Sequence, residues 1–131
     1  MGVSGTTNLL KVQLVGDILV SGQGIGKKSA CGNLCVCKTE EEAIYDCKPG
    51  DILVIPQTSN RILPQIKNCI GIITETDGEN SHAAIAGLAL EIPVIVGAES
   101  ATHILKNGTT VTMDASRGVV FNSRCCPMET A

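Results

Sequence analysis

The sequence predicts an α/β fold with a mainly parallel central sheet. Three short segments, at 51–55 (DILVI), 70–74 (IGIIT) and 93–97 (PVIVG), are continuously apolar, which is typical of strands buried on both faces. Segments with helical patterns lie between them, as in sheets built from strand–helix–strand units. The chain has 131 residues, 44% of them hydrophobic. It is therefore long enough to form one domain with its own core.

The first half of the chain is expected to supply strands and one short helix. A possible short strand lies at 9–15, within a polar lead-in. The glycine-rich segment 22–32, GQGIGKKSACG, is expected to form tight turns that lead into a strand at 34–38. Thr39 is a suitable N-cap for a helix that opens with three glutamates, and a Lys-Pro-Gly sequence at 48–50 ends that helix.

The second half is expected to alternate helices and strands. Thr58 or Ser59 can cap a second helix over 60–68, with Pro64 in its first turn. The remaining expected elements are a helix over 81–90, a short helix over 100–108 closed by Gly108, and strands at 109–114 and 118–122 around a Ser-Arg-Gly turn.

Composition excludes several classes of function. The formal net charge is −3 and aromatic residues make up 2% of the chain, whereas a nucleic-acid-binding domain usually has a basic face or stacking aromatics. The longest apolar stretch, 83–98, contains Glu91 and Pro93 and is too short to cross a bilayer. Nothing at the N-terminus resembles a signal peptide. We therefore expect a soluble, cytoplasmic protein without nucleic-acid or membrane partners.

The seven cysteines have no CxxC spacing. On a strand, Cys31, Cys35 and Cys37 would all point to one face. A zinc site needs four ligands, and only His82 and His103 could join these thiols as histidine ligands. We therefore expect no metal site, and we expect reduced thiols that pack as small hydrophobic side chains in a cytosolic protein. The full set is Cys31, Cys35, Cys37, Cys47, Cys69, Cys125 and Cys126.

The glycine-rich segment does not match the known phosphate-binding loops. The Walker pattern needs glycine at position 21 and serine or threonine at position 28, where this chain has Ser21 and Lys28. The dinucleotide fingerprint would require glycine at position 27, which is Lys27. The segment is interpreted as structural, although its two lysines could attract an anion without a defined cradle.

His82 is the main candidate for a functional residue. Asn80 or Ser81 can cap the helix that follows, which leaves backbone N–H groups and the positive end of the helix dipole beside the imidazole. A phosphate can be bound there by backbone donors. A neutral imidazole is also a competent nucleophile near pH 7. The residues alone leave three interpretations open: a nucleophile, an anion site, or a residue at a helix start without a chemical role.

The segment from 51 to 122 resembles the mobile phosphohistidine domain of phosphoenolpyruvate-utilising enzymes, such as pyruvate phosphate dikinase and phosphoenolpyruvate synthase. The matching features are the glycine-rich strand at 22–36, DILVI-P-x-T at 51–58, IITE at 72–75, G-x-x-SHAAI at 78–85, IPVIVG at 92–97, Ala101, Leu105, Gly108 and the closing VTMDASRGVV. This resemblance implies a swivelling β/β/α domain in which His82 carries a phosphoryl group.

The chain departs from the catalytic members of that family at three positions. Asp77 and Asn80 stand where those members have glycine and threonine, and Leu88 replaces an arginine. Residues 82 and 88 are about 240° apart around a helix, so the arginine would act indirectly. Glu75, Asp77 and Glu79 are expected to surround His82 with negative charge, which disfavours an incoming phosphate and favours imidazolium.

The N-terminal segment indicates which variant of the family this is. Residues 4–12, SGTTNLLKV, resemble the last strand of pyruvate kinase, and some bacterial pyruvate kinases carry a phosphohistidine-like domain directly after that strand. The resemblance implies that 1–16 is a remnant of the preceding domain with a linker, that 17–122 is the phosphohistidine-like domain, and that 123–131 is a flexible tail.

The same resemblance implies a parent that transfers phosphate from phosphoenolpyruvate to ADP with Mg²⁺ and K⁺, and that forms a homotetramer. No cofactor is expected in this segment, which should be inactive by itself. Its partners would be the remaining domains of the parent and a phosphorylated metabolite.

Three hypotheses follow. The first is a regulatory or structural module with an anion site at Asn80, Ser81, His82, Ala83 and Ala84. The second is an active phosphocarrier that takes phosphate from phosphoenolpyruvate at His82. The third, a metal or redox module, depends only on the cysteine count.

Overall fold

The computed structural model describes residues 18–76 and 82–122. Three expectations fall outside these residues: the lead-in at 1–16 with its strand at 9–15, the helix cap at Asn80 or Ser81, and the tail at 123–131.

Eight strands and five short helical segments make up the described part of the chain. The strands are β1 (Ile18–Ser21), β2 (Gln23–Ile25), β3 (Ser29–Val36), β4 (Ile52–Ile55), β5 (Gly71–Thr74), β6 (Val94–Val96), β7 (Thr110–Asp114) and β8 (Val119–Asn122). The helices are α2 (Glu40–Asp46), the 3₁₀ helix η1 (Asn60–Ile62), α3 (Leu63–Asn68), α4 (His82–Leu90) and α5 (Ala101–Ile104). The expected α/β class is confirmed. Within the described residues, none of these helices combines the length and apolar character needed to cross a membrane.

The expectation of a mainly parallel sheet is wrong. The strand order is β1-β8-β7-β3-β4-β5-β6-β2. The pairs β3–β4, β4–β5 and β5–β6 are parallel, whereas β1–β8, β8–β7, β7–β3 and β6–β2 are antiparallel. Each parallel pair is joined through a helical crossover. The strands β1, β2, β7 and β8 lie before or after this helical part of the chain and pair antiparallel with their neighbours. The sheet is therefore mixed.

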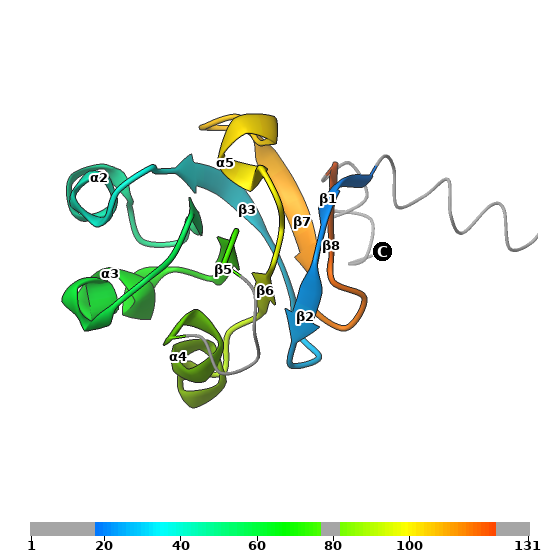
Figure 1. Ribbon diagram of the computed structural model, residues 1–131, viewed down its shortest axis with the longest axis horizontal. Helices are drawn as coiled ribbons and strands as arrows, with labels where there is room; N and C mark the ends of the chain where they lie inside the picture. Colours follow the sequence, from blue (N-terminus) through cyan, green and yellow to red (C-terminus); the bar gives the residue numbers. More distant parts are fainter. Residues whose placement is uncertain (1–17, 77–81, 123–131) are drawn as a thin grey trace, which may run out of the picture.

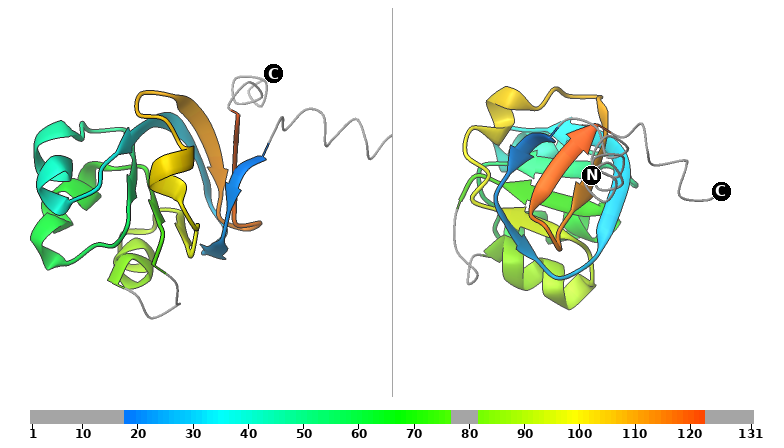
Figure 2. Two further views of the ribbon diagram at one scale, coloured as in Figure 1. Left: turned by 45° about the horizontal axis from the view of Figure 1, so that its top comes forward. Right: turned by 90° about the vertical axis from the view of Figure 1, so that its right-hand side faces the viewer.

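Strand β3 connects the two parts of the sheet. Its first half, residues 29–33, pairs with β7, and its second half, residues 34–36, pairs with β4. Figure 1 shows the result as three layers: α2, α3 and α4 cover one face of β4–β6, and β1, β7 and β8 lie beyond the other face. The left view of Figure 2 shows the same separation, and the right view looks onto β1 and β8 with the other strands behind them. This arrangement agrees with the expected β/β/α layering.

Two apolar cores follow from this layering. On β4, Leu53 and Ile55 belong to the core beneath the helices, while Ile52 and Val54 belong to the core between the two parts of the sheet. All four side chains are at most 1% exposed. Since successive residues of a strand point to opposite faces, a strand covered on both faces must be apolar throughout. This confirms the sequence-based interpretation of 51–55.

The glycine-rich segment differs from its prediction as a loop of tight turns. It contains β2 and the start of β3, joined by a turn at which Gly26 has φ +87°. A Cβ at Gly22 would meet the Val96 carbonyl, and one at Gly24 would meet the Ala115 carbonyl. Glycine is therefore needed here mainly for close backbone packing, which a sequence pattern does not distinguish from turn formation.

The helix predictions are confirmed with adjustments at their ends. Thr39 caps α2 by accepting a hydrogen bond from the Glu42 N–H at 3.2 Å. The predicted helix over 60–68 is divided into η1, capped by the Ser59 hydroxyl, and α3, with Pro64 in its first turn. Helix α5 ends by Leu105, so Gly108 does not close it; Gly108 instead lies in the connection to β7 with φ +83°.

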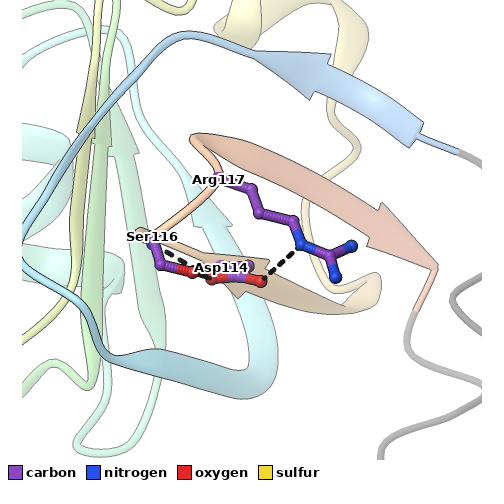
Figure 3. Close-up of polar contacts among 3 residues, drawn as sticks. All are labelled: Asp114, Ser116 and Arg117. Atoms are coloured by element: carbon purple, nitrogen blue, oxygen red, sulfur yellow. Dashed lines mark hydrogen bonds and ion pairs between the residues drawn. The ribbon is translucent and has the colours of Figure 1, made fainter.

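The predicted turn between the last two strands is organised by Asp114. One of its carboxylate oxygens accepts hydrogen bonds from the Ser116 N–H at 3.0 Å and the Ser116 hydroxyl at 2.6 Å. The other lies 3.6 Å from Arg117 Nε (Figure 3). Gly118 completes the turn at φ +70°, where a larger residue would be strained. The hairpin forms as predicted. Its two strands are antiparallel because a short turn joins them directly.

Candidate functional site

His82 is the first residue of α4, as predicted, and both nitrogens of its ring are hydrogen-bonded. Nδ1 lies 2.8 Å from the Thr58 hydroxyl oxygen, and Nε2 lies 2.8 Å from Asn60 Oδ1. The side chain is half-buried. The imidazole is therefore fixed between two polar side chains.

These partners determine which proton arrangement the ring can have. With Asn60 Oδ1 at Nε2, the ring donates from Nε2–H, and a neutral ring then accepts the Thr58 hydroxyl proton at Nδ1. Turning the Asn60 amide over would place its NH₂ group at Nε2; Thr58 would then accept from Nδ1–H. Only in this second arrangement does Nε2 have the lone pair that a nucleophile needs. Thr58 and Asn60 together therefore control the reactivity of the ring.

Neither partner is among the site residues that the sequence predicts. Thr58 belongs to the family motif at 51–58 and is a possible helix cap, but Ser59 caps η1 instead. Asn60 is the first residue of η1. Both side chains reach His82 because the β4–η1 connection passes beside the start of α4. The threonine of the P-x-T motif is the one sequence feature that points to Thr58 as a site residue. No sequence feature points to Asn60.

A small pocket of about 130 Å³ lies beside His82, lined by Gln57, Thr58, Thr74, Thr76, His82 and Ala83. Its hydroxyl groups are already engaged. Thr74 donates to the Thr76 carbonyl at 3.2 Å, and Thr76 donates to the Pro56 carbonyl at 2.6 Å. Neither lysine nor arginine is among the lining residues. In this conformation the pocket offers few side-chain donors to an anion.

A larger pocket of about 310 Å³ shares Gln57 and Thr58 with the first one. Its charged groups largely neutralise one another. Arg61 Nη2 lies 3.8 Å from the Glu41 carboxylate, and the Ser59 hydroxyl donates to Glu40 at 2.6 Å. Lys38 is the other cation in the lining. The larger pocket therefore does not supply a strong positive potential next to His82.

Helix α4 packs closely against the sheet through small residues. Ala83, Ala84, Ala86 and Gly87 are its buried residues, and a Cβ at Gly87 would overlap the Val94 side chain on β6. This packing fixes the direction of the helix start, and with it His82.

The other end of α4 is fixed by the glycine-rich segment. Glu91 follows the helix at φ 59°, a left-handed conformation that is uncommon outside glycine. Lys28 donates to the Glu91 carbonyl at 3.0 Å and lies 3.7 Å from its carboxylate. Lys28, one of the two lysines that could attract an anion, therefore binds the residue that ends α4.

The Glu75 carboxylate, expected near His82, has its hydrogen-bond partner in α5. It accepts hydrogen bonds from the Thr102 N–H at 2.8 Å and the Thr102 hydroxyl at 2.7 Å. Ser100, at the N-cap position of α5, makes no side-chain capping bond. Glu75 thus caps α5, which belongs to the core on the other face of the sheet from α4. Asp77 and Glu79 lie outside the described residues.

Glu75 should make stability depend on pH. Burial alone would raise the pKa of Glu75, but the two Thr102 hydrogen bonds and nearby His103 lower it. A lowered pKa contributes stability above the ordinary glutamate value of about 4.3, and this contribution is lost as the pH falls through the lowered value. Glu75→Gln should therefore be less stable than the wild type at neutral pH, and the difference should vanish in strong acid.

Urea denaturation of both proteins across acid and neutral pH measures this difference. Glu99→Gln is the matched control, because Glu99 is exposed and lies just before α5. A stability difference for Glu75→Gln that stays constant down to strong acid would contradict the capping role.

The remaining predicted positions are only partly brought together. Leu88 is 57% exposed and lines a different pocket from His82, with Lys27, Lys28 and Glu91 among its neighbours. This agrees with the angular separation predicted from helix geometry. Ala83 and Ala84 are buried in the first turn of α4. Asn80 and Ser81 lie outside the described residues.

The expectation of reduced thiols is wrong for Cys31, Cys35 and Cys47, which are disulfide-bonded. Cys35, in β3, and Cys47, at the end of α2, form a disulfide with a Cα–Cα distance of 5.6 Å. The Cys37 sulfur lies 3.5 Å from that of Cys35 and 3.9 Å from that of Cys47. Cys37 and Cys69 are free, buried thiols. The shared parity of Cys35 and Cys37 indicated a common face, but spacing alone did not identify Cys47 as their neighbour.

Comparisons with known proteins agree with the α/β fold class and show the family. Residues 47–118 match the family described as PEP-utilising enzyme, mobile domain. Pyruvate kinase of Bacillus licheniformis is 46% identical over 124 residues, which are 95% of this chain and 21% of that protein. Pyruvate kinase of Geobacillus stearothermophilus is 48% identical over 121 residues, which are 92% of this chain and 21% of that protein. The chain thus spans about a fifth of the length of these curated relatives.

Among solved structures, a solution structure of Enzyme I is similar to this chain with a TM-score of 0.52 and 28% sequence identity. The similarity covers 60% of this chain and 32% of that one.

Proposed function

Because this chain belongs to the mobile-domain family of PEP-utilising enzymes, we propose that it is a structural or regulatory module of a pyruvate kinase and not a phosphohistidine carrier. The similarity to pyruvate kinases over about a fifth of their length supports this parentage. In this proposal the parent transfers phosphate from phosphoenolpyruvate to ADP with Mg²⁺ and K⁺ as a homotetramer. This module contacts the remaining domains of the parent.

One observation carries the proposal: both ring nitrogens of His82 are hydrogen-bonded, in a pocket that no lysine or arginine lines. Phosphoryl transfer needs a free nitrogen lone pair and positive charge that offsets the charge of the transferring group. Asn60 Oδ1 faces Nε2, and the hydroxyls of Thr74 and Thr76 donate to backbone carbonyls. The described residues therefore favour a histidine that stabilises the β4–η1 connection.

A weak anion site at Asn80, Ser81, His82, Ala83 and Ala84 is part of the same proposal. The first turn of a helix presents backbone N–H groups, and the helix dipole favours negative charge there by about 0.3–1 kcal/mol at an exposed position. A phosphorylated metabolite would bind in this way without covalent chemistry. Weak binding is expected, because the adjoining pocket supplies few side-chain donors.

The second candidate function is the phosphohistidine carrier, and Thr58 is the observation that favours it. A hydroxyl that accepts from Nδ1–H would leave the Nε2 lone pair free for phosphorylation. This requires the Asn60 amide to move away from Nε2, because an amide that is only turned over would donate an N–H to that lone pair. The two functions therefore differ in whether His82 Nε2 is hydrogen-bonded to Asn60 or has a free lone pair.

Phosphorus NMR at alkaline pH tests the choice between them. The protein is incubated with phosphoenolpyruvate and Mg²⁺, and spectra of the wild type and His82→Ala are compared. We expect no phosphoramidate signal in either protein. A wild-type signal that is absent from His82→Ala would establish the carrier function.

Amide chemical shifts, measured during titration with inorganic phosphate, test the anion site. The expected result is a set of shift changes confined to residues 80–84 that approach saturation only at high phosphate concentration.

The Asn60→Ala variant extends the phosphorus NMR experiment. If Asn60 alone suppresses phosphorylation of His82, this substitution should produce the phosphoramidate signal. Absence of that signal in both the wild type and Asn60→Ala would support the module.

A further inference from the structure

Three sulfur atoms meet in the core beneath the helices, away from the His82 pocket. Cys35, Cys37 and Cys47 have their sulfurs within 4.8 Å of one another. Cys35 and Cys37 come from β3 and the residue after it, at positions two apart, and Cys47 comes from the C-terminal end of α2. Cys37 is fully buried and Cys35 is 3% exposed. The fold therefore brings together soft ligands that are distant in sequence.

We propose that the reduced protein binds one Zn²⁺ ion through the thiolates of Cys35, Cys37 and Cys47. A Zn–S bond of about 2.3 Å in tetrahedral geometry places the sulfurs about 3.8 Å apart. The Cys37 sulfur already lies 3.5 and 3.9 Å from the other two. Only the bonded pair, Cys35 and Cys47, has to separate.

The surroundings favour a divalent cation over a monovalent one. The carboxylates of Glu42, Asp46 and Asp51 act on Cys37 electrostatically, so this part of the core is acidic. Three thiolates and a monovalent ion would leave two negative charges here, whereas Zn²⁺ leaves one.

A surface pocket of about 190 Å³ lies beside Cys35 and is also lined by Asp46, Lys48 and Asp51. The two carboxylates outnumber the single lysine, so the charge at this opening favours a cation. Among the described residues, no fourth cysteine, histidine or carboxylate completes the group. A solvent molecule can take the fourth position, as in zinc sites with three protein ligands.

The disulfide and the zinc site are alternative states of the same sulfurs. A phosphine reductant and one water molecule convert the Cys35–Cys47 bond into two thiols, and the phosphine becomes its oxide. Zn²⁺ then forms three Zn–S bonds, and the three thiol protons are released to the buffer. Metal binding is therefore conditional on reduction.

Metal retention after desalting tests the proposal. The full chain is reduced with a phosphine, loaded with Zn²⁺ and desalted, and zinc is measured per chain. Wild type and Cys69→Ser should each retain one equivalent; Cys69 is a buried thiol of the same core that lies outside the sulfur group. Cys37→Ser should retain no zinc after reduction. In its oxidised form this variant still has both cysteines of the Cys35–Cys47 disulfide, so its folding can be checked before reduction. The oxidised wild type should also retain none.

Cobalt gives a second measurement. Co²⁺ added to the reduced wild type should produce an intense sulfur-to-metal charge-transfer band that Zn²⁺ removes and that Cys37→Ser lacks. Reduced wild type without retained zinc would overturn the proposal. Equal retention by Cys37→Ser would also overturn it, because the metal would then be held by other cysteines.

Discussion

Replacing Gly24 with alanine is expected to destabilise the protein by about 3 kcal/mol, at the upper end of the usual cost of overpacking. The new Cβ would overlap the carbonyl group of Ala115, next to the turn between β7 and β8. That backbone cannot easily retreat, because the Ala115 N–H donates to the Lys28 carbonyl at 3.0 Å. On its other edge, β2 is paired with β6. Relief of the overlap would therefore require one of these connections to break.

Chemical denaturation of the Gly24→Ala protein measures this cost. Gln23→Ala is the matched control, since Gln23 precedes Gly24 in the same strand and is exposed. It should change stability by less than about 0.5 kcal/mol. Equal stability of Gly24→Ala and the wild type would mean that β2 and the β7–β8 turn do not pack as closely as described.

The second large effect is expected from loss of the Cys35–Cys47 disulfide. The bond joins residues 12 apart in sequence, and closing a loop of this size stabilises a protein by about 3 kcal/mol in the chain-entropy account. Helix α2 depends on this link, because Ala43 is its only fully buried residue among those described. Cys47→Ser should therefore lower the free energy of unfolding by about this amount under oxidising conditions.

The wild type supplies its own control for this prediction. A phosphine reductant with a metal chelator should lower its stability to that of Cys47→Ser treated in the same way. The same treatment should lower the stability of Cys47→Ser by less, because that protein lacks the Cys35–Cys47 bond from the start, whereas Cys31 is disulfide-bonded in both proteins. If the two proteins are equally stable before reduction, the bond does not contribute to folding.

Several elements were predictable because their signals are local. Thr39 and the three glutamates after it specify the start of α2 within one helical turn. The apolar strands and the small residues of α4 likewise show their burial directly in the sequence. Together with the motif around His82, these local patterns identified the α/β class and the family.

The surroundings of His82 could not be obtained in this way. Thr58 and Asn60 are 24 and 22 residues away from His82, and each is a short polar residue of a kind that is common in loops. Glu75, expected near the histidine, is hydrogen-bonded to Thr102, 27 residues away. Proximity in sequence suggested that Glu75 lies beside His82. The direction of the chain at the end of β5 instead brings the Glu75 carboxylate to Thr102.

Strand direction and the sulfur group were also decided by tertiary structure. Periodicity indicates which faces of a strand are buried, but it contains no information about the direction of the neighbouring strand. Four of the seven strand pairs among the described residues are antiparallel, and the pairing of residues 29–33 with 110–114 is one of them. In the same way, the passage of β3 beside the end of α2 brought Cys47 to Cys35 and Cys37. The sequence by itself determined local structure and family, whereas long-range packing decided which side chains meet, because such contacts depend on the whole sheet.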